Sequence, residues 1–245
     1  MLRESKKINQ EFGFESEAEA VKEYSSLNRD FMSFNYPLIV DEIISGLDLE
    51  KRFILDVGTG LGSLACEFAK KVDTQEVYGI DISPQMLAAA EENARKEKIA
   101  NIKFILCDIH NLEFPDNFFD LIVSFGVLHH LKDISLAFQE MRRVLKKGAS
   151  AFIYDLRKDA PQEVVSEINS HMLPLQRKAF MESQREALKA SLIEKVLLEA
   201  GIFQYSLSYP EYSRETVRKN KDLLRRSKLC GQRFNRVLLQ VYFKK

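Results

Sequence analysis

Tryptophan is absent from the 245 residues of this chain, and glycine and cysteine are scarce. The 36 basic and 36 acidic side chains cancel, which argues against a strongly basic nucleic-acid binder. No apolar run approaches the roughly 18 residues that a membrane span needs, and the polar first ten residues do not resemble a secretory signal. We therefore expect a cytoplasmic protein with no membrane partner.

The residue types that bind metals or form disulfides are few and scattered. The cysteines are Cys66, Cys107 and Cys230. Because they are odd in number and lack C-x-x-C spacing, they predict buried thiols rather than a disulfide framework or a zinc site. The histidines are His110, His129, His130 and His171. This spacing does not indicate a metal cluster, so no metal is expected.

Glycine is scarce overall but concentrated in one place. Ten glycines in 245 residues is about 4%, against about 7% in an average protein. Three of them, Gly58, Gly60 and Gly62, lie within five positions, directly after the apolar run Phe53–Val57. A glycine-rich turn lets ligand atoms approach bare backbone, and the helix start that follows presents unpaired N–H groups with positive potential. The cluster by itself favours nucleotide binding of some kind.

Seven short apolar runs, rich in β-branched and aromatic residues, predict seven strands. They span residues 53–57, 77–80, 102–107, 121–125, 151–154, 202–207 and 237–243. Segments of helical length separate the first five, which predicts successive β-α-β units. The last run alternates well and is expected to lie antiparallel at or near the sheet edge. The expected fold is a Rossmann-like α/β three-layer sandwich with a seven-stranded, mostly parallel sheet and an antiparallel last strand.

Two helices have recognisable ends. Ser83 is a typical N-cap for a helix with Pro84 as its first residue. Asp133 can cap a later helix, whose last turn is expected to carry Lys146 and Lys147 and which is expected to stop at Gly148.

We expect one domain over residues 1–245, with three additions to the repeating core. Residues 1–52 predict a helical N-terminal cover, and residues 158–184 an insertion that acts as a lid. Residues 211–236 form a basic insertion with nine lysines or arginines against three acids.

Acidic residues stand at or near the ends of the first three predicted strands. They are Asp56, Asp81 and Asp108. Asp81 follows Gly62 by 19 residues, where nucleotide-binding α/β folds place an acid on the ribose hydroxyls. Because ligands of open parallel sheets bind beyond the carboxyl ends of the strands, the three acids are expected to converge on one cleft.

Over about residues 53–155, the chain resembles the class I S-adenosylmethionine (SAM)-dependent methyltransferases, specifically their small-molecule group. The motifs that carry the resemblance are D-V-G-T-G at 56–60, D-I-S-P-Q-M-L at 81–87, D-x-x-x-L-x-F-P-D-x-x-F-D at 108–120, L-H-H-L at 128–131 and K-K-G at 146–148. They occur in order and at the spacing of the family. The resemblance implies an enzyme that transfers a methyl group from SAM to a small-molecule acceptor.

The resemblance also implies a cofactor site on named residues. Its expected members are Asp56, Gly58, Thr59, Gly60, Asp81, Ile82, Met86, Asp108, Ile109, Ser124 and Phe125. Residues 58–60 would cradle the methionine portion of SAM, and Asp81 would accept hydrogen bonds from the ribose. Ile82 and Met86 would flank the adenine, while residues 108–109 would meet its polar edge.

The remaining members would act nearer the reacting sulfur. Asp56 would order the glycine-rich turn or reach the cofactor's ammonium group, and Ser124 and Phe125 would border the sulfonium. Methyl transfer needs no dedicated nucleophile, since alignment in a dry, shaped cleft supplies much of the rate. If the acceptor must lose a proton, His129 or His130 is the candidate base.

Contacts to the acceptor are expected mainly from the N-terminal cover and the lid insertion. The candidates, chosen by position, are Tyr24, Phe31, Phe34, Tyr36, Tyr154, His171, Met172 and Tyr209.

Other functions fit part of the sequence. Gly60, Gly62 and Ala65 satisfy G-x-G-x-x-A, the pattern of NAD(P)-binding oxidoreductases, although Asp108 argues against that class. The basic segment 211–236 would suit a methyltransferase that acts on RNA or protein. However, such runs usually form a solvated helix face, and no Asn-Pro-Pro-Tyr or Pro-Cys motif of base methylases is present. A protein that binds SAM without turnover is a third alternative.

Overall fold

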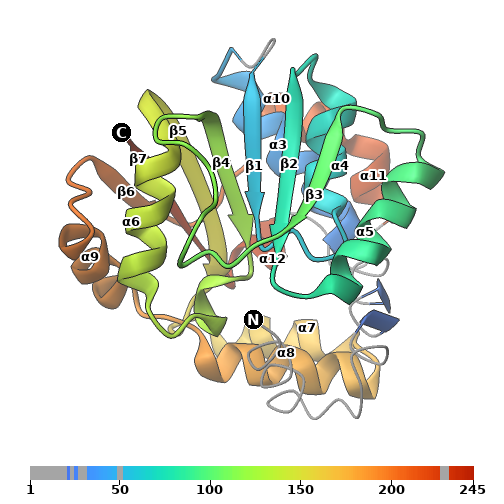
Figure 1. Ribbon diagram of the computed structural model, residues 1–245. Helices are drawn as coiled ribbons and strands as arrows, with labels where there is room; N and C mark the ends of the chain where they lie inside the picture. Colours follow the sequence, from blue (N-terminus) through green and yellow to red (C-terminus); the bar gives the residue numbers. More distant parts are fainter. Residues whose placement is uncertain (1–20, 23–24, 27–31, 49–51, 227–231) are drawn as a thin grey trace.

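A seven-stranded sheet forms the centre of the computed structural model, which describes residues 21–22, 25–26, 32–48, 52–226 and 232–245 (Figure 1). The strands are β1 (Phe53–Val57), β2 (Glu76–Asp81), β3 (Ile102–Leu106), β4 (Phe119–Phe125), β5 (Leu145–Leu156), β6 (Tyr205–Ser208) and β7 (Leu238–Lys244). Each predicted strand is confirmed; β1 has the predicted bounds, and the other six have shifted ends. Strand β6 begins later than predicted because the Ile202 N–H instead closes the preceding helix on Leu197 O, at 2.9 Å.

The strand order in the sheet is β3-β2-β1-β4-β5-β7-β6. Neighbours from β3 to β5 pair in parallel, whereas β7 is antiparallel to both β5 and β6. The predicted fold class, a mostly parallel sheet with an antiparallel last strand, is therefore confirmed. Strand β7 lies one position inside the edge, which β6 forms. The dinucleotide-binding order 3-2-1-4-5-6 contains no such antiparallel strand between its last two members.

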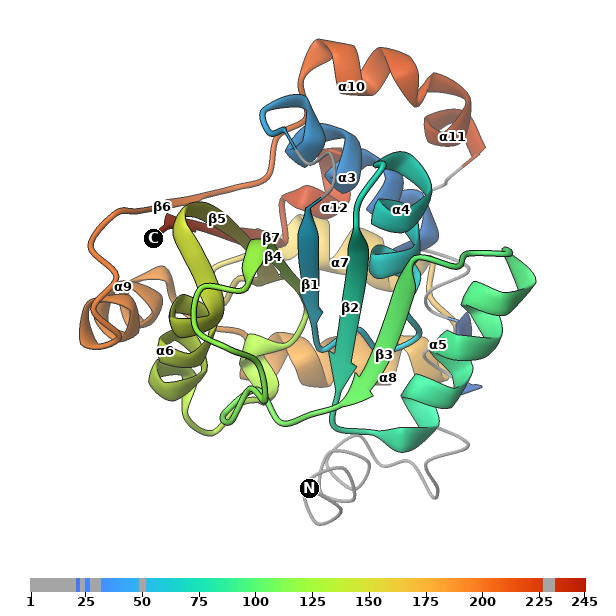
Figure 2. The same ribbon diagram turned by 45° about the horizontal axis from the view of Figure 1, so that its top comes forward.

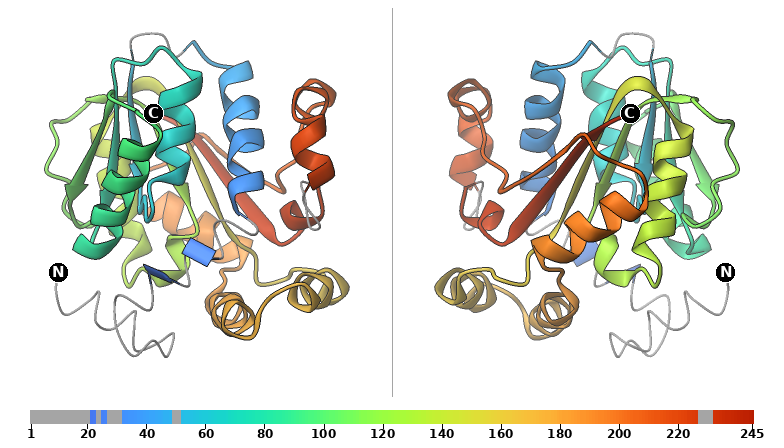
Figure 3. Two further views of the ribbon diagram at one scale, coloured as in Figure 1. Left: turned by 90° about the vertical axis from the view of Figure 1, so that its right-hand side faces the viewer. Right: turned by 90° about the vertical axis from the view of Figure 1, so that its left-hand side faces the viewer.

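Helices cover both faces of the sheet. In chain order, the helices are η1 (Met32–Phe34), α3 (Tyr36–Ser45), α4 (Ser63–Lys71), α5 (Pro84–Lys96), η2 (Leu128–His130), α6 (Ile134–Val144), α7 (Gln162–Ser170), α8 (Pro174–Glu186), α9 (Ala190–Glu199), α10 (Arg214–Lys219), α11 (Lys221–Arg226) and α12 (Gln232–Asn235). Helices α3 and α4 lie on one face, and α6 and α9 on the other (Figures 1 and 3). None of the described helices is long and apolar enough to cross a membrane.

Successive side chains along the strands pack into two separate cores, one on each face of the sheet. Ile54 and Leu121 point to the α3–α4 face and pack with Phe68, whereas Leu55 and Ile122 point to the α6–α9 face. This two-sided burial follows from the period of two along a strand. It explains why the strand sequences are continuously apolar, as the first four runs predicted.

The predicted N-caps are present, but one helix end was predicted wrongly. The Ser83 side chain accepts from Met86 N, and Asp133 accepts from Leu136 N. Helix α6 does not reach Gly148, because it ends at Val144 and Leu145 already pairs with Phe119 in the sheet. The register between β4 and β5 then shifts, and Gly148 takes its left-handed φ of 79° within this irregular start of β5.

The insertions occupy distinct places around the core. Helices α7 and α8 lie beyond the carboxyl ends of the strands (Figure 1) and share a third apolar core with Leu156 and Phe234. Helices α10 and α11 lie outside α3 (Figure 2), where Thr216 Oγ1 donates to Glu42 Oε2 at 2.7 Å. The basic insertion is thus largely remote from the strand ends that the sequence marked as a ligand site.

Candidate functional site

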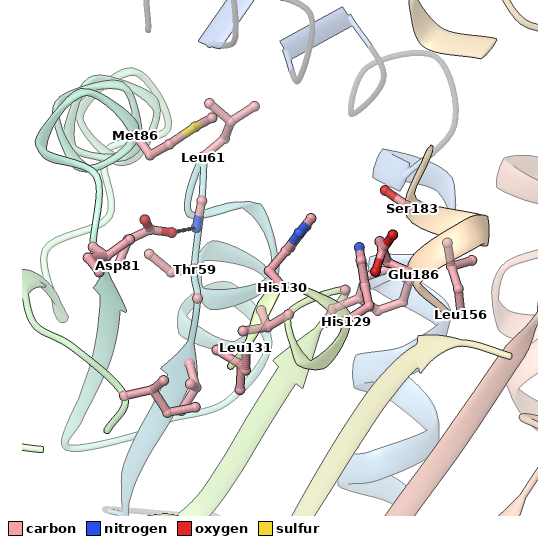
Figure 4. Close-up of a pocket in the computed structure, with 18 of the residues that line it drawn as sticks. Thr59, Leu61, Asp81, Met86, His129, His130, Leu131, Leu156, Ser183 and Glu186 are labelled. Carbon is pink, nitrogen blue, oxygen red and sulfur yellow. Dashed lines mark hydrogen bonds between the residues drawn. The ribbon is translucent and has the colours of Figure 1, made fainter. Parts of the chain in front are cut away.

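A cavity of about 730 Å³ lies where the parallel strands end (Figure 4). We call the side built on β1, β2 and β3 the glycine-rich wall; it comprises Gly58, Thr59, Gly60, Leu61, Asp81, Ile82, Met86, Asp108, Ile109 and His110. The opposite side, the α8 wall, comprises Leu156, Ala179, Phe180, Glu182, Ser183, Arg185, Glu186, Phe234 and Leu238. Figure 4 shows His130 between the two walls.

The glycine-rich turn is tied to the end of β2. Gly60 N donates to Asp81 Oδ2 at 2.9 Å, and Ser83 N donates to the other carboxylate oxygen, also at 2.9 Å. Burial raises the pKa of Asp81, although these N–H groups act against the rise. Gly60 has a φ of 52°, and a Cβ built on it would meet no atom within 4 Å. The space beside Gly60 is therefore open cavity, as a closely approaching ligand requires.

Two expected cofactor residues lie behind this turn rather than on the cavity surface. Asp56 is buried and accepts from Thr59 Oγ1 at 2.8 Å. Burial raises its pKa to about 7. Ser124 is also buried, and its Oγ donates to Val57 O at 2.9 Å. These contacts suit the ordering role expected of Asp56. Ser124 does not line the cavity, whereas its neighbour Phe125 does.

The end of β3 contributes an acid and a histidine. Asp108 Oδ1 accepts from His110 N at 2.9 Å and lies 2.8 Å from His110 Nδ1. Burial acts to raise the pKa of Asp108, but the two interactions with His110 outweigh it and hold the pKa below its ordinary value. His110 was not among the predicted site residues. Its position two residues after Asp108 in the sequence is the signal that could have identified it.

The L-H-H-L motif brings both of its histidines to the cavity. His129 Nδ1 lies 2.6 Å from Asp155 Oδ1, and both side chains are buried. His130 lies against it, with 3.9 Å between ring centroids. Burial and the neighbouring His129 lower the pKa of His130 to about 3. Asp155 was missed, although it stands near the carboxyl end of β5, the position that singled out the acids of the first three strands.

Of the expected acceptor contacts, Tyr36 lines the cavity and packs edge-on against Phe125, with ring centroids 5.5 Å apart. Burial raises the pKa of the Tyr36 hydroxyl, and the nearby Asp56 adds to the rise. Phe34 is half-buried and does not line the cavity. Tyr24 and Phe31 lie outside the described residues.

The structure places four other expected acceptor contacts away from the cavity. Tyr154 points to the α3 face of the sheet, opposite to its neighbour Ile153, because successive strand residues alternate. Met172 is buried in the core beneath α7 and α8. His171 is exposed at the end of α7, and Tyr209 stacks on the Arg157 guanidinium at 3.7 Å on the surface.

Most of the α8 wall was not predicted residue by residue. Phe180, Ser183 and Glu186 reach the cavity because α8 lies across the strand ends, at the end of the predicted insertion and just beyond it. Phe234 comes from the basic insertion. No local motif marks these residues, since only the docking of α8 and α12 brings them together.

The strand order and this cavity define a class of protein. The fold is that of the class I SAM-dependent methyltransferases. A family model described as a methyltransferase domain matches residues 50–208, well over half of the chain. The chain belongs to this methyltransferase domain family.

Individual relatives agree with this membership. An uncharacterised methyltransferase of Schizosaccharomyces pombe is 45% identical over 39% of this chain and 36% of its own length. A ubiquinone/menaquinone biosynthesis C-methyltransferase of Burkholderia ambifaria is 34% identical over 60% of this chain and 66% of its own. A SAM-dependent methyltransferase structure from Methanococcus maripaludis aligns with a TM-score of 0.69, 23% identity and coverage of 92% and 91%. The chain spans about one third to two thirds of the curated relatives it matches.

Proposed function

We propose that the protein transfers a methyl group from SAM to a small-molecule acceptor. The observation that carries the proposal is a single cavity whose glycine-rich wall offers bare backbone and two carboxylates, while its α8 wall offers mainly apolar side chains. One wall suits a nucleoside cofactor and the other an organic acceptor. Membership of the methyltransferase domain family supports the same assignment.

The residues of the glycine-rich wall fit SAM. Open space beside Gly60 admits a ligand against the backbone, and Asp81 retains acceptor capacity for ribose hydroxyls beyond its two N–H donors. Ile82, just before α5, and Met86, in its first turn, line the cavity where they would flank the adenine. When bound, SAM supplies an electrophilic methyl group on a sulfonium.

The α8 wall suits an acceptor with a largely apolar body. Phe180, Phe234 and Leu238 are buried side chains that line this wall. Two carboxylates of α8, those of Glu182 and Glu186, also line this wall, together with Arg185. The quinone-biosynthesis relative is consistent with an acceptor of this character.

The chain's own contribution to the reaction would be alignment and exclusion of water. Methyl transfer removes the positive charge of the sulfonium, so a site that shields the reactants from water favours the transition state. Helices α7 and α8 would provide this shield as the lid over the strand ends. A cavity of about 730 Å³ is large enough for a cofactor together with a small acceptor.

The proposal is tested by following the label from methyl-labelled SAM. The protein is incubated with labelled SAM and a cell extract separated into small-molecule, RNA and protein fractions, and products are identified by mass spectrometry. We expect label in the small-molecule fraction. Label confined to RNA or protein would contradict the small acceptor, and absence of label with bound SAM would identify a protein that binds without transfer.

A further inference from the structure

His129 is held by contacts that fix its ring. It lies in η2, in the segment that follows β4, and its Nδ1 is 2.6 Å from Asp155 Oδ1. The side chains are only 3% and 4% exposed. Asp155 is itself oriented, because Oδ2 accepts from Leu128 N at 2.6 Å and Oδ1 accepts from Leu156 N at 2.7 Å.

These contacts determine which ring nitrogen of neutral His129 carries the proton. Burial acts to raise the pKa of Asp155, but the interaction with His129 and the donated hydrogen bonds outweigh it and hold the pKa below its ordinary value. Asp155 is therefore an ionised acceptor, which places the imidazole proton on Nδ1 of His129. Nε2 is left with a lone pair. Within the described part of the chain, this buried atom has no hydrogen-bond partner, and His129 lines the cavity.

The other cavity histidines are less suited to accept a proton from an acceptor. The pKa of His130 is lowered to about 3 by burial and by His129, so it binds a proton too weakly near neutral pH. His110 is paired with Asp108 on the glycine-rich wall, where the adenine edge is expected. In Figure 4, His129 lies on the same side of the pocket as Glu186, across from Asp81 and Met86.

We infer that His129 is the general base of the proposed reaction and that Asp155 is its positioning residue. The inference rests on the proposed function and deepens it, because it requires an acceptor atom that carries a removable proton. His129 Nε2 takes that proton while the acceptor's electron pair forms the bond to the methyl carbon. The electron pair of the broken carbon–sulfur bond stays on sulfur, and His129 ends as an imidazolium ion facing Asp155.

The charges around His129 come from several elements. Asp155 faces it from β5 and His130 from its own turn. Glu182, Arg185 and Glu186 of α8, together with Lys132, line the same cavity. The acids favour the imidazolium product, while the nearby cations oppose it.

The tautomer is tested on the wild-type protein by nitrogen-15 NMR of the histidine rings. We expect the neutral His129 ring to carry its proton on Nδ1 at pH 8, facing Asp155. A neutral ring protonated at Nε2 would overturn the inference without any variant. His171, which is exposed at the end of α7, provides the reference histidine.

Activity is tested with methyl-labelled SAM and the small-molecule extract fraction as acceptor source. We expect His129→Gln to slow label transfer about 100-fold or more, with calorimetric affinity for S-adenosylhomocysteine within twofold of wild type. Asp155→Asn should retain that affinity, slow transfer at least tenfold and alter the pH profile on its acidic side. His171→Gln should match wild type in every measurement.

The outcomes separate this inference from the proposed function. If His129→Gln bound S-adenosylhomocysteine normally and transferred the label at the wild-type rate, the general-base role of His129 would be overturned. The proposed methyl transfer would be unaffected. An Asp155→Asn variant with an unaltered pH profile would overturn the positioning role. If wild-type protein bound no S-adenosylhomocysteine, the proposed function and the inference would both fail.

Discussion

Gly60 and Asp81, 21 residues apart, are joined by a 2.9 Å hydrogen bond from the Gly60 N–H to the Asp81 carboxylate. The bond ties the glycine-rich turn after β1 to the end of β2. It places a bare stretch of backbone and an acceptor for hydroxyl groups on the same wall of the cavity. This pairing is the structural basis for proposing that SAM binds here.

Asp81→Ala is expected to weaken SAM binding by about 1–3 kcal/mol, because the ribose loses hydrogen bonds to a charged acceptor and Gly60 loses its anchor. Calorimetric titration of the folded variant measures the change. Asp133→Ala is the matched control: it removes an aspartate that accepts from Leu136 N at the start of α6, outside the cavity. It should lower the melting temperature and leave SAM affinity unchanged. Unaltered affinity in Asp81→Ala would rule out the ribose role.

Gly60→Ala is expected to reduce SAM affinity at least tenfold, because the added methyl group occupies the space where the cofactor approaches the backbone. Gly148→Ala is a close control. Both glycines have a positive φ, 52° and 79°, and at both a Cβ would meet nothing within 4 Å. Each variant should therefore lose a similar 1–2 kcal/mol of stability from left-handed strain. Of these two glycines, only Gly60 lines the cavity. Equal SAM affinities in the two variants would therefore contradict binding of the cofactor against the Gly60 backbone.

Asp56→Asn is expected to flatten the pH dependence of stability. The unfolded carboxyl loses its proton near pH 3.8 and the folded one near pH 7. Between these values the folded state binds more protons, so stability falls as the pH rises from about 4 to 7. At about 1.4 kcal/mol per pKa unit, the full cost is roughly 4 kcal/mol above pH 7.

Urea unfolding at pH 4, 5.5 and 8 measures this effect. Relative to wild type, the Asp56→Asn variant should gain stability as the pH rises, while Asp73→Asn, at an exposed position, should follow the wild-type curve. Parallel curves for wild type and Asp56→Asn would show that the Asp56 carboxyl ionises equally easily in both states.

Arg143→Ala is expected to destabilise the fold by about 2 kcal/mol. Its guanidinium pairs with Glu140 at 2.8 Å and donates to Leu112 O at 2.7 Å and Phe114 O at 2.8 Å, which ties the segment after β3 to α6. Charged donors make the stronger hydrogen bonds, but the side chain is 32% exposed, so water reduces the gain.

Chemical denaturation checks this prediction, with Arg142→Ala as the control because that neighbour is exposed. Arg143→Lys should recover only part of the loss, since an ammonium group does not reproduce the planar fork. Equal stability of the two alanine variants would show that these contacts contribute nothing.

Features governed by local sequence were predictable. The apolar run Phe53–Val57 and the three glycines after it indicated the strand and the turn, and Asp81 followed from the rule that ligands bind at strand ends. Ser83 and Asp133 were recognisable as caps because a cap acts on residues two or three positions away.

Features set by long-range packing were not predictable in the same way. The α8 wall exists because α8 docks across the strand ends, and Phe234 reaches the same cavity from far along the chain. Gly148 resembled a helix stop, but pairing of Leu145 with Phe119 starts β5 earlier. The side of the sheet that Tyr154 faces depends on the register of β5.

The most direct test of SAM binding is a calorimetric titration of the full chain with S-adenosylhomocysteine and, separately, with NADH. The glycine-rich wall predicts saturable binding of one S-adenosylhomocysteine per chain, weakened in Asp81→Ala and Gly60→Ala, and no binding of NADH. Binding of NADH without binding of S-adenosylhomocysteine or SAM would contradict the account and favour an oxidoreductase.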